Sequence, residues 1–292
     1  MAASGPPEHS TSAVRPVEPP RVSRAGRNLW AAITVGLVMA AGIVVALVTV
    51  RHVFIGIVAA TVAVSTWELA GAMRRAGIRV ALPPVLLGGQ AMVWLPWPFG
   101  MAGLVVAFMI TALACLVWRF PGGAAGYVRD VSASVFAAAY VPGFAAFATL
   151  LVLPPDGTAR VLCLMTAAVA SDVGGYAAGV LGGRHPMAPA ISPKKSWEGF
   201  IGSLVAGIAA GVLSVTYLLG GQFWHGMLFG AAMVLTATGG DLIESLIKRD
   251  LGVKDMGTVL PGHGGFLDRL DSLLPSAVVS WLLLSLLVPT SG

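Results

Sequence analysis

The chain has 292 residues, 18 of them Lys or Arg and 13 of them Asp or Glu, so that 11% are charged. Soluble domains carry charges on about 25% of their residues. Hydrophobic residues make up 57% of the chain, and its mean hydropathy is +0.85. These values exclude a soluble globular enzyme, a disordered chain and a disulfide scaffold, and they predict an all-α polytopic integral membrane protein.

The first 27 residues differ in composition from the rest. They are polar, rich in Pro, Ser and Ala, and contain four arginines. Such a segment cannot bury a hydrophobic core, so we predict a disordered cytoplasmic tail over 1–27. The remaining chain is divided by its motifs into N-terminal transmembrane helices over 28–169 and C-terminal transmembrane helices over 170–292 that carry the polar motifs.

Spanning helices are predicted from apolar runs of about 20 residues, the length needed to cross the hydrocarbon core. The third run contains Pro83 and Pro84 and is the weakest of the set. The predicted segments are nine in number: 29–50, 53–73, 80–98, 101–118, 132–153, 160–182, 200–220, 223–244 and 273–290.

The basic residues predict the orientation of these segments. With the tail in the cytoplasm and the segments alternating, 16 of the 18 Lys and Arg residues fall on the cytoplasmic side, all but Arg51 and Arg160. Lys and Arg are enriched in cytoplasmic loops, so this distribution supports an odd number of spans and a tail inside the cell. The net charge of +5 then reflects loops beside anionic lipid, and we expect no nucleic-acid partner.

Acidic residues concentrate in the C-terminal part. Eight of the 13 lie between Asp172 and Asp271. Asp172, Asp241 and Glu244 fall within or at the end of predicted spans, where an ionisable side chain is costly and marks a functional site. A structural role for Glu68 is expected instead, as a partner of Arg74 or Arg75 near the membrane interface.

The spacing of the acids predicts that they converge. Asp241, Glu244, Ser245 and Lys248 recur at intervals that place them on one helix face, at the cytoplasmic end of the eighth segment. Clustered carboxylates without His or Cys partners suit Mg²⁺, which is commonly held by one or two carboxylates together with substrate phosphates. The sequence therefore predicts a polar, metal-dependent site facing the cytoplasm.

Two cytoplasmic loops, 183–199 and 245–272, are rich in Gly, His and charge. Their lysines and arginines could clamp phosphate oxygens, and the run Gly262–Gly265 would let backbone N–H groups approach an anion closely. Carboxylates, cations and a glycine turn are the parts needed for phosphoryl or nucleotidyl transfer. The chain has no G-x-x-x-x-G-K-[ST] motif, which excludes a P-loop site.

The run from Ser245 to Asp271 resembles the signature of the phosphatidate cytidylyltransferases, also called CDP-diacylglycerol synthases. It reads S-L-I-K-R-x4-K-D-x-G-x3-P-G-H-G-G-F-x-D-R-L-D. Two weaker elements agree, S-P-K-K-S-W-E-G at 192–199 and D-V-G-G-Y at 172–176, where Gly175 replaces a common Ala. The resemblance is strong over 170–272 and topological over 28–169.

This resemblance implies a nine-helix enzyme of the bacterial plasma membrane that forms a homodimer. It would condense CTP with phosphatidic acid to CDP-diacylglycerol and pyrophosphate, for phospholipid biosynthesis, with one or two Mg²⁺ ions. By motif position, the catalytic residues would be Asp241, Asp268, Asp271, Lys248 and Arg249, and the metal ligands Asp241, Asp268, Asp271, Glu244 and Asp172. Substrate would be bound by Ser192, Lys194, Lys195, Arg184, Ser245, Lys254, His263, Gly264, Gly265 and Arg269.

Two alternatives stay open from the residues. One is a CTP-dependent enzyme acting on another lipid, such as a polyprenol kinase or an isoprenoid-lipid cytidylyltransferase. The other is a transporter or channel that uses the buried acids as an ion path, which would place those acids near the bilayer midplane. Metal-dependent release of pyrophosphate from CTP would exclude the transporter, and proton-coupled uptake without CTP would exclude the enzyme.

Overall fold

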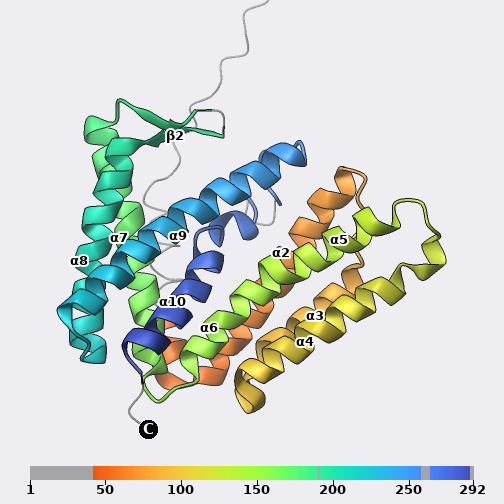
Figure 1. Cartoon of the computed structure of the whole chain (residues 1–292), viewed down its shortest axis with the longest axis horizontal. Coiled ribbons are helices and arrows are strands. Elements are labelled where there is room, and N and C mark those ends of the chain that lie inside the picture. The colour runs from red at the N-terminus through yellow and green to blue at the C-terminus, as the bar shows by residue number, and fades with distance from the viewer. Residues whose placement is uncertain (1–41, 190, 258–263, 290–292) are drawn as a thin grey trace, which may run out of the picture. The chain divides into compact units, whose positions relative to one another are not determined.

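The computed structural model describes residues 42–189, 191–257 and 264–289 (Figure 1). Ile43–Gly292 belongs to one compact unit. The predicted tail, 1–27, lies outside the described residues, as does most of the first predicted segment, of which 42–49 are helical. The predicted boundary between 169 and 170 falls inside the helix Gly157–Gly182. The division therefore separates chain parts by their motifs and not by a break in the structure.

Helices make up most of the described chain, and the predicted all-α architecture is confirmed. Each predicted segment after the first coincides with a helix, and segment 132–153 coincides with the pair α5 and α6. Besides the helical residues 42–49, the described chain contains the α-helices α2 (Arg51–Arg75), α3 (Leu82–Trp94), α4 (Pro96–Trp118), α5 (Tyr127–Ala138), α6 (Phe144–Val152), α7 (Gly157–Gly182), α8 (Trp197–Leu219), α9 (Phe223–Asp250) and α10 (Leu273–Leu287).

Six helical stretches of the described chain are long and apolar enough to cross a membrane. Helices α3 and α10 have 13 and 15 residues, shorter than the segments predicted for them and than the usual span of about 20. The six stretches are Arg51–Arg75, Pro96–Gly122, Tyr127–Val152, Gly157–Gly182, Trp197–Leu219 and Phe223–Asp250.

Proline and glycine explain where two of the helical stretches are interrupted. Gly100 adopts φ +56° inside α4, which separates a short first turn from the long remainder of the helix. Between α5 and α6, Ala139–Gly143 forms a π-helical turn that contains Pro142. Proline has no N–H to donate, and the wider turn accommodates that loss within one spanning stretch.

A short antiparallel hairpin connects α7 to α8, within the loop predicted at 183–199. It pairs β1 (Pro186–Ala188) with β2 (Ser192–Ser196). Ser196 ends β2 and caps α8, because its Oγ accepts the N–H of Gly199 at 3.1 Å. Figure 1 shows β2 leading into α8, and Lys195 is the last residue but one of β2.

Helices α7, α8 and α9 pack closely through glycines. A Cβ built on Gly202 of α8 would lie 2.5 Å from the carbonyl oxygen of Gly174 on α7, and one on Gly211 would lie 2.5 Å from that of Gly226 on α9. Small residues allow membrane helices to approach at such distances. These contacts hold both α7 and α9 against α8, and α7 and α9 each contribute an acidic residue to the cavity described below.

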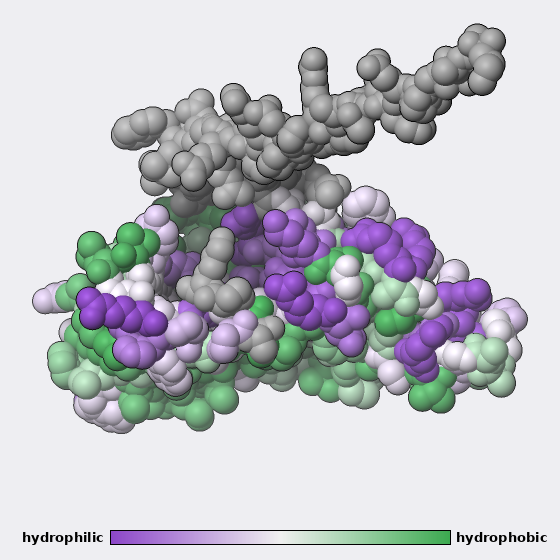
Figure 2. Space-filling model, turned by 90° about the horizontal axis from the view of Figure 1, so that it is seen from above, coloured by the Kyte–Doolittle hydropathy of each residue, from purple (hydrophilic) through white to green (hydrophobic). Residues whose placement is uncertain are grey.

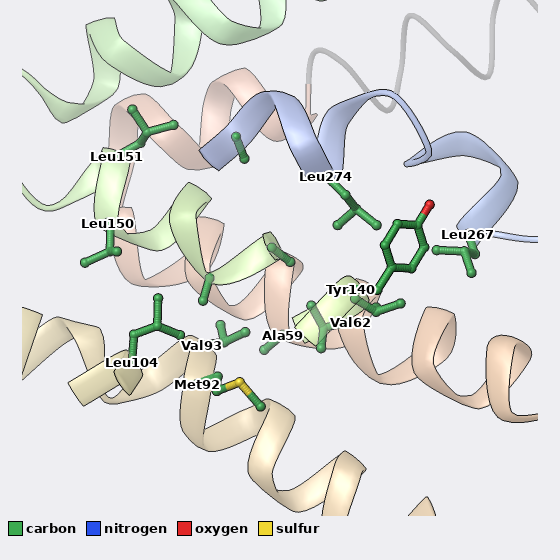
Figure 3. Packing of buried hydrophobic residues seen from close by; sticks show 14 of the residues in the cluster. Ala59, Val62, Met92, Val93, Leu104, Tyr140, Leu150, Leu151, Leu267 and Leu274 are labelled. Atoms are coloured by element: carbon green, nitrogen blue, oxygen red, sulfur yellow. The ribbon is translucent and has the colours of Figure 1, made fainter. Parts of the chain in front are cut away.

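The buried core connects the N-terminal helices to the C-terminal ones. Tyr140, in the π-helical turn, points toward Leu274 of α10 and Leu267, and Val62 of α2 lies beside it (Figure 3). Outward-facing positions are apolar as well: Ile110 on α4 and Leu181 on α7 are exposed in the isolated chain. Such exposed apolar residues are expected on helices that face lipid.

Candidate active site

A cavity of about 420 Å³ lies among α7, α8, α9 and the segment that precedes α10. Its wall is unusually polar for a chain of this composition, and it combines carboxylates with two cations. The charged residues that line it are Asp172, Lys195, Asp241, Asp268, Arg269 and Asp271. Hydrophilic residues gather on the face that is seen from above, the side on which Figure 1 shows the β1–β2 hairpin (Figure 2).

Two of the acids come from spanning helices. Asp172 projects from α7 and Asp241 from α9, and the side chain of Asp241 forms an ion pair with Lys195 of β2. Both partners of this pair are partly exposed to the cavity, Lys195 by 23% and Asp241 by 36%. A cation that is already held beside the cavity needs little rearrangement to meet an anionic ligand there.

Asp268 lies in a short 3-10 turn, η3 (Leu267–Arg269), and its carboxylate is surrounded by donors. It accepts the N–H of Gly265 at 2.8 Å, the N–H of Met256 at 3.1 Å and the Nζ of Lys248 at 3.0 Å. Burial would raise the pKa of Asp268, but these donors outweigh burial and hold its pKa below the usual value. Asp268 is therefore an anchored carboxylate in its ionised form.

Behind Asp268, Lys248 connects two acids. Its Nζ lies 3.0 Å from Asp268 Oδ1 and 3.3 Å from Glu244 Oε2, and Glu244 is fully buried. Lys248 and Glu244 stand four residues apart on α9, as their spacing predicts. Asp271 accepts the N–H of Ser272 at 2.6 Å, and burial, together with the nearby Asp241, raises its pKa. The acids thus differ in how readily they ionise.

The donor set of the cavity fits a hard cation. Its four lining carboxylates are the oxygen ligands that Mg²⁺ prefers. In their present arrangement, no three Asp, Glu, His or Cys side chains of the described residues lie close enough to hold an ion together. Mg²⁺ usually takes only one or two carboxylates and completes its shell with water and phosphate, so the residues fit an ion that arrives with a phosphate ligand.

The other predicted site residues lie at different distances from the cavity. Ser192 lies in β2, and Ser245 and Arg249 lie on α9, outside the residues that line the cavity. Lys254, Arg249 and Arg184 are exposed. The side chain of Lys194 and all of His263 lie outside the described residues.

Arg184 and Gly264 have local roles in the backbone. The N–H of Arg184 donates to Glu198 Oε2 at 3.1 Å, and His185 Nδ1 lies 2.6 Å from Glu198 Oε1, so this acid organises the turn before β1. Gly264 has φ +83°, a conformation that favours glycine, directly before Gly265 and its bond to Asp268. Gly264 and Gly265 thus shape the loop around Asp268.

Sequence reasoning missed two features of this region. Ser171, Ser203 and Thr238 line the cavity as uncharged polar groups, and nothing in their spacing distinguishes them from other helix serines and threonines. Glu68 was expected to pair with Arg74 or Arg75, and that prediction is wrong for the described residues. Its Oε2 accepts the N–H of Leu267 at 2.9 Å instead.

The described part of the chain is mainly helical, with six stretches able to span a membrane and an acid-lined cavity among its C-terminal helices, which defines a polytopic membrane protein with a polar cavity. The chain belongs to the Cytidylyltransferase family, which it matches over residues 30–287.

Named relatives agree with this membership. A phosphatidate cytidylyltransferase of Mycobacterium bovis is 51% identical over 278 residues, which cover 91% of each chain. That of Mycobacterium leprae is 50% identical over 280 residues, 90% of each chain. The Helicobacter pylori enzyme of the same name is 42% identical over 138 residues, 47% of this chain and 51% of the relative. The strongest similarity thus extends along nearly the whole length.

Proposed function

We propose that this protein is a phosphatidate cytidylyltransferase, which condenses CTP with phosphatidic acid to give CDP-diacylglycerol and pyrophosphate. One observation carries the proposal: about half of the residues are identical to proteins of that name along nine-tenths of the chain. The acid-lined cavity and the apolar helices supply the two environments that a charged nucleotide and a lipid require.

The reaction places specific demands on the protein. A phosphate oxygen of phosphatidic acid attacks the α-phosphorus of CTP, and the bond from that phosphorus to the oxygen bridging to the β-phosphate breaks. The electron pair leaves with pyrophosphate. Since the lipid phosphate is already anionic at pH 7, no Ser or Cys nucleophile and no strong base is required. The barrier is repulsion between two anions, and positive charge fixed in the site lowers it.

Lys195 and Arg269 are the cations that line the cavity, and we assign them to the phosphates of CTP. Lys195 would exchange its partner Asp241 for a phosphate oxygen, which frees that carboxylate for a second role. Lys248 stays beneath the cavity, where it keeps Asp268 oriented. Charge-assisted bonds from such cations to phosphate are among the stronger interactions in proteins.

Mg²⁺ would be held by carboxylates drawn from Asp172, Asp241, Asp268 and Asp271 together with the phosphates of the nucleotide, with Glu244 close behind. When bound, the ion would neutralise charge on the attacking and leaving phosphate oxygens. Through the ion, these four carboxylates would determine the position of the nucleotide phosphates in the cavity.

With this function we propose a site that faces the cytoplasm of a bacterial cell, where CTP is available. We also propose that the protein forms a homodimer. The cytoplasmic orientation is supported by the distribution of basic residues, of which 16 of 18 fall on one side of the predicted spans. The homodimer is supported by the resemblance of the chain to its family. The mass of the detergent-purified protein measured by light scattering tests it.

The function is tested with purified protein in lipid nanodiscs, CTP labelled at the α-phosphate, and phosphatidic acid. We expect CDP-diacylglycerol and pyrophosphate in equal amounts, and a requirement for Mg²⁺ that EDTA abolishes. Asp241→Asn should be inactive, whereas Asp250→Asn, at the exposed end of the same helix, should turn over normally.

Other acceptors test the alternatives. Polyprenol and polyprenyl phosphate are offered in place of phosphatidic acid in parallel reactions. Turnover of either one, with no product from phosphatidic acid, would contradict the proposed substrate while preserving nucleotide chemistry at the site. A polyprenol kinase would transfer the γ-phosphate and release CDP, so the absence of both pyrophosphate and CDP with every acceptor would reject the enzyme.

A further inference from the structure

Glu68 is a buried acid from the N-terminal half of the chain that contacts the signature loop of the C-terminal half. It lies on α2 and is 2% exposed. Its Oε2 accepts the backbone N–H of Leu267 at 2.9 Å, across a separation of 199 residues. Leu267 is itself fully buried and directly precedes Asp268. The carboxylate therefore bonds to the backbone next to one of the proposed metal ligands.

The backbone of the loop closes around this carboxylate. A Cβ added at Gly257 would lie 2.1 Å from Glu68 Oε1, and one at Gly265 would lie 2.7 Å from Glu68 Oε2. Both glycines are thus in direct contact with the acid, and neither tolerates a side chain without movement of Glu68. This packing gives a physical reason for two glycines of the signature run that anion binding does not require.

A second contact from the same helix supports the loop. Arg75, two turns after Glu68 on α2, donates from Nη2 to the carbonyl oxygen of Met256 at 3.2 Å. The N–H of Met256 in turn donates to Asp268 at 3.1 Å. Helix α2 therefore bonds to the loop backbone on both sides of Gly257–Gly265, once through an anion and once through a cation.

A packing role alone does not explain an acid at this position. Burying a carboxylate is costly, and a hydrophobic side chain of similar volume would fill the same space more cheaply. What the carboxylate adds is an acceptor for an N–H that would otherwise be buried without one. Ligating acids are commonly held in place by such outer contacts, and small displacements of a catalytic group reduce rates strongly.

We propose that Glu68 is a positioning residue of the active site. It fixes the backbone of Leu267, and with it the direction in which Asp268 and Asp271 face the cavity, while Arg75 fixes Met256. The catalytic part of this proposal rests on the proposed function. The structural part, that α2 anchors the loop through these two bonds, does not depend on it.

The test uses the full-length protein in nanodiscs and two substitutions of similar size. Glu68→Gln keeps an acceptor for the Leu267 N–H, and Glu68→Met removes it. Ser65→Ala, a buried position one turn away on α2, is the control. Amide hydrogen exchange of peptides covering 250–272 is compared with that of α7 and α8, and kcat and the KM for CTP are measured with phosphatidic acid.

We expect Glu68→Met to accelerate exchange in 264–270 by about tenfold or more, with α7 and α8 unchanged. Its kcat should fall by at least about tenfold with a smaller change in KM, and Glu68→Gln should recover most of both losses. If the amides of 264–270 exchange at the wild-type rate in Glu68→Met, the proposed anchoring is overturned. If Glu68→Gln and Glu68→Met lose kcat equally, or if amide exchange accelerates throughout the protein, the positioning role is overturned.

Arg75 keeps the proposal testable if Glu68→Met does not fold. Arg75 and Arg74 are both exposed neighbours on α2, so either can be replaced by Gln without disturbing the core. Arg75→Gln should accelerate exchange near Met256, and Arg74→Gln should not; equal behaviour of the two contradicts the anchoring. A wild-type protein that makes no CDP-diacylglycerol rejects the proposed function, whereas the exchange data still decide the role of α2.

Discussion

Asp268 is the residue whose chemistry the structure constrains most. Its carboxylate accepts from two backbone N–H groups and from the Lys248 ammonium. Replacement by Asn would set an amide NH₂ against these donors and would remove a proposed metal ligand. We expect Asp268→Asn to retain less than about a tenth of the wild-type rate of CDP-diacylglycerol formation while the protein still inserts in the membrane.

The control for Asp268 is Asp250→Asn. Asp250 is exposed at the end of α9, and its neutralisation should leave the rate unchanged. Both variants are quantified in membranes before assay, so that a loss of protein is not mistaken for a loss of activity. A rate for Asp268→Asn above about a tenth of wild type would contradict the metal role.

Lys195 allows a separate prediction about the nucleotide. It lines the cavity and is paired with Asp241, so its removal takes away a phosphate contact without creating a large cavity in the core. We expect Lys195→Met to raise the KM for CTP by about tenfold or more, and Lys195→Arg to restore part of it. An unchanged KM in steady-state assays would show that Lys195 does not meet the nucleotide.

Residue spacing predicted the shared face of Asp241, Glu244 and Lys248 because a helix has a fixed period. It could not predict the partner of Glu68. From the sequence, Arg74 and Arg75 were the nearest opposite charges, and a neighbouring ion pair was the simplest expectation. The actual partner is a backbone N–H 199 residues away. Because nearly every residue has the same backbone N–H, the sequence does not indicate which one will bond to a distant side chain.

At the scale of elements, the helices follow from hydropathy but their interruptions do not. Segments 80–98 and 132–153 were predicted as single spans. The former yields the 13-residue α3, and the latter contains the π-helical turn at Pro142. Both interruptions occur at a proline, Pro96 after α3 and Pro142 in the turn, and proline has no backbone N–H to continue the helix. The length of an apolar run does not report them.

The α7–α8 contact gives a prediction at this scale. A Cβ on Gly202 would lie 2.3 Å from the Cβ of Ala178 and 2.5 Å from the carbonyl oxygen of Gly174. Gly202→Ala must therefore separate the two helices, and we expect it to lower stability by about 1–3 kcal/mol. Because α7 carries Asp172, activity should fall as well.

Thermal unfolding in detergent measures this effect with a thiol-reactive dye, since Cys115 and Cys163 are fully buried and react on unfolding. The matched control is Gly56→Ala on α2, where a Cβ has no neighbour within 4 Å. It should unfold at the wild-type temperature or slightly above, because Ala favours helix over Gly. Equal behaviour of the two variants would contradict close packing at Gly202.

On the scale of the whole molecule, the contacts of the proposed site are not confined to the helices that carry the signature. The sequence places every proposed ligand after residue 170, yet α2 supplies Glu68 and Arg75 to the loop that carries Asp268. The C-terminal helices alone would leave the N–H of Leu267 and the carbonyl of Met256 without these partners. We therefore expect both halves of the chain to be needed to form the proposed site.

The orientation of the molecule gives the last prediction. Tyr127–Val152 is a continuous helical stretch of 26 residues, long enough at 1.5 Å per residue to cross the hydrocarbon core. Ala124 and Pro155 are exposed at its two ends. The basic residues predict that Ala124 faces the cytoplasm. In intact cells, a membrane-impermeant maleimide should label Pro155→Cys, and it should label Ala124→Cys only after permeabilisation.

The native thiols give a low background in this experiment, because both are fully buried, and each variant is first shown to be active. The cavity lies near the end of α7 that leads into the hairpin, the side on which Ala124 is predicted. Labelling of Ala124→Cys in intact cells would place that end, and the cavity with it, outside the cytoplasm. CTP could not then reach the site, so this result would contradict the proposed orientation and the proposed reaction together.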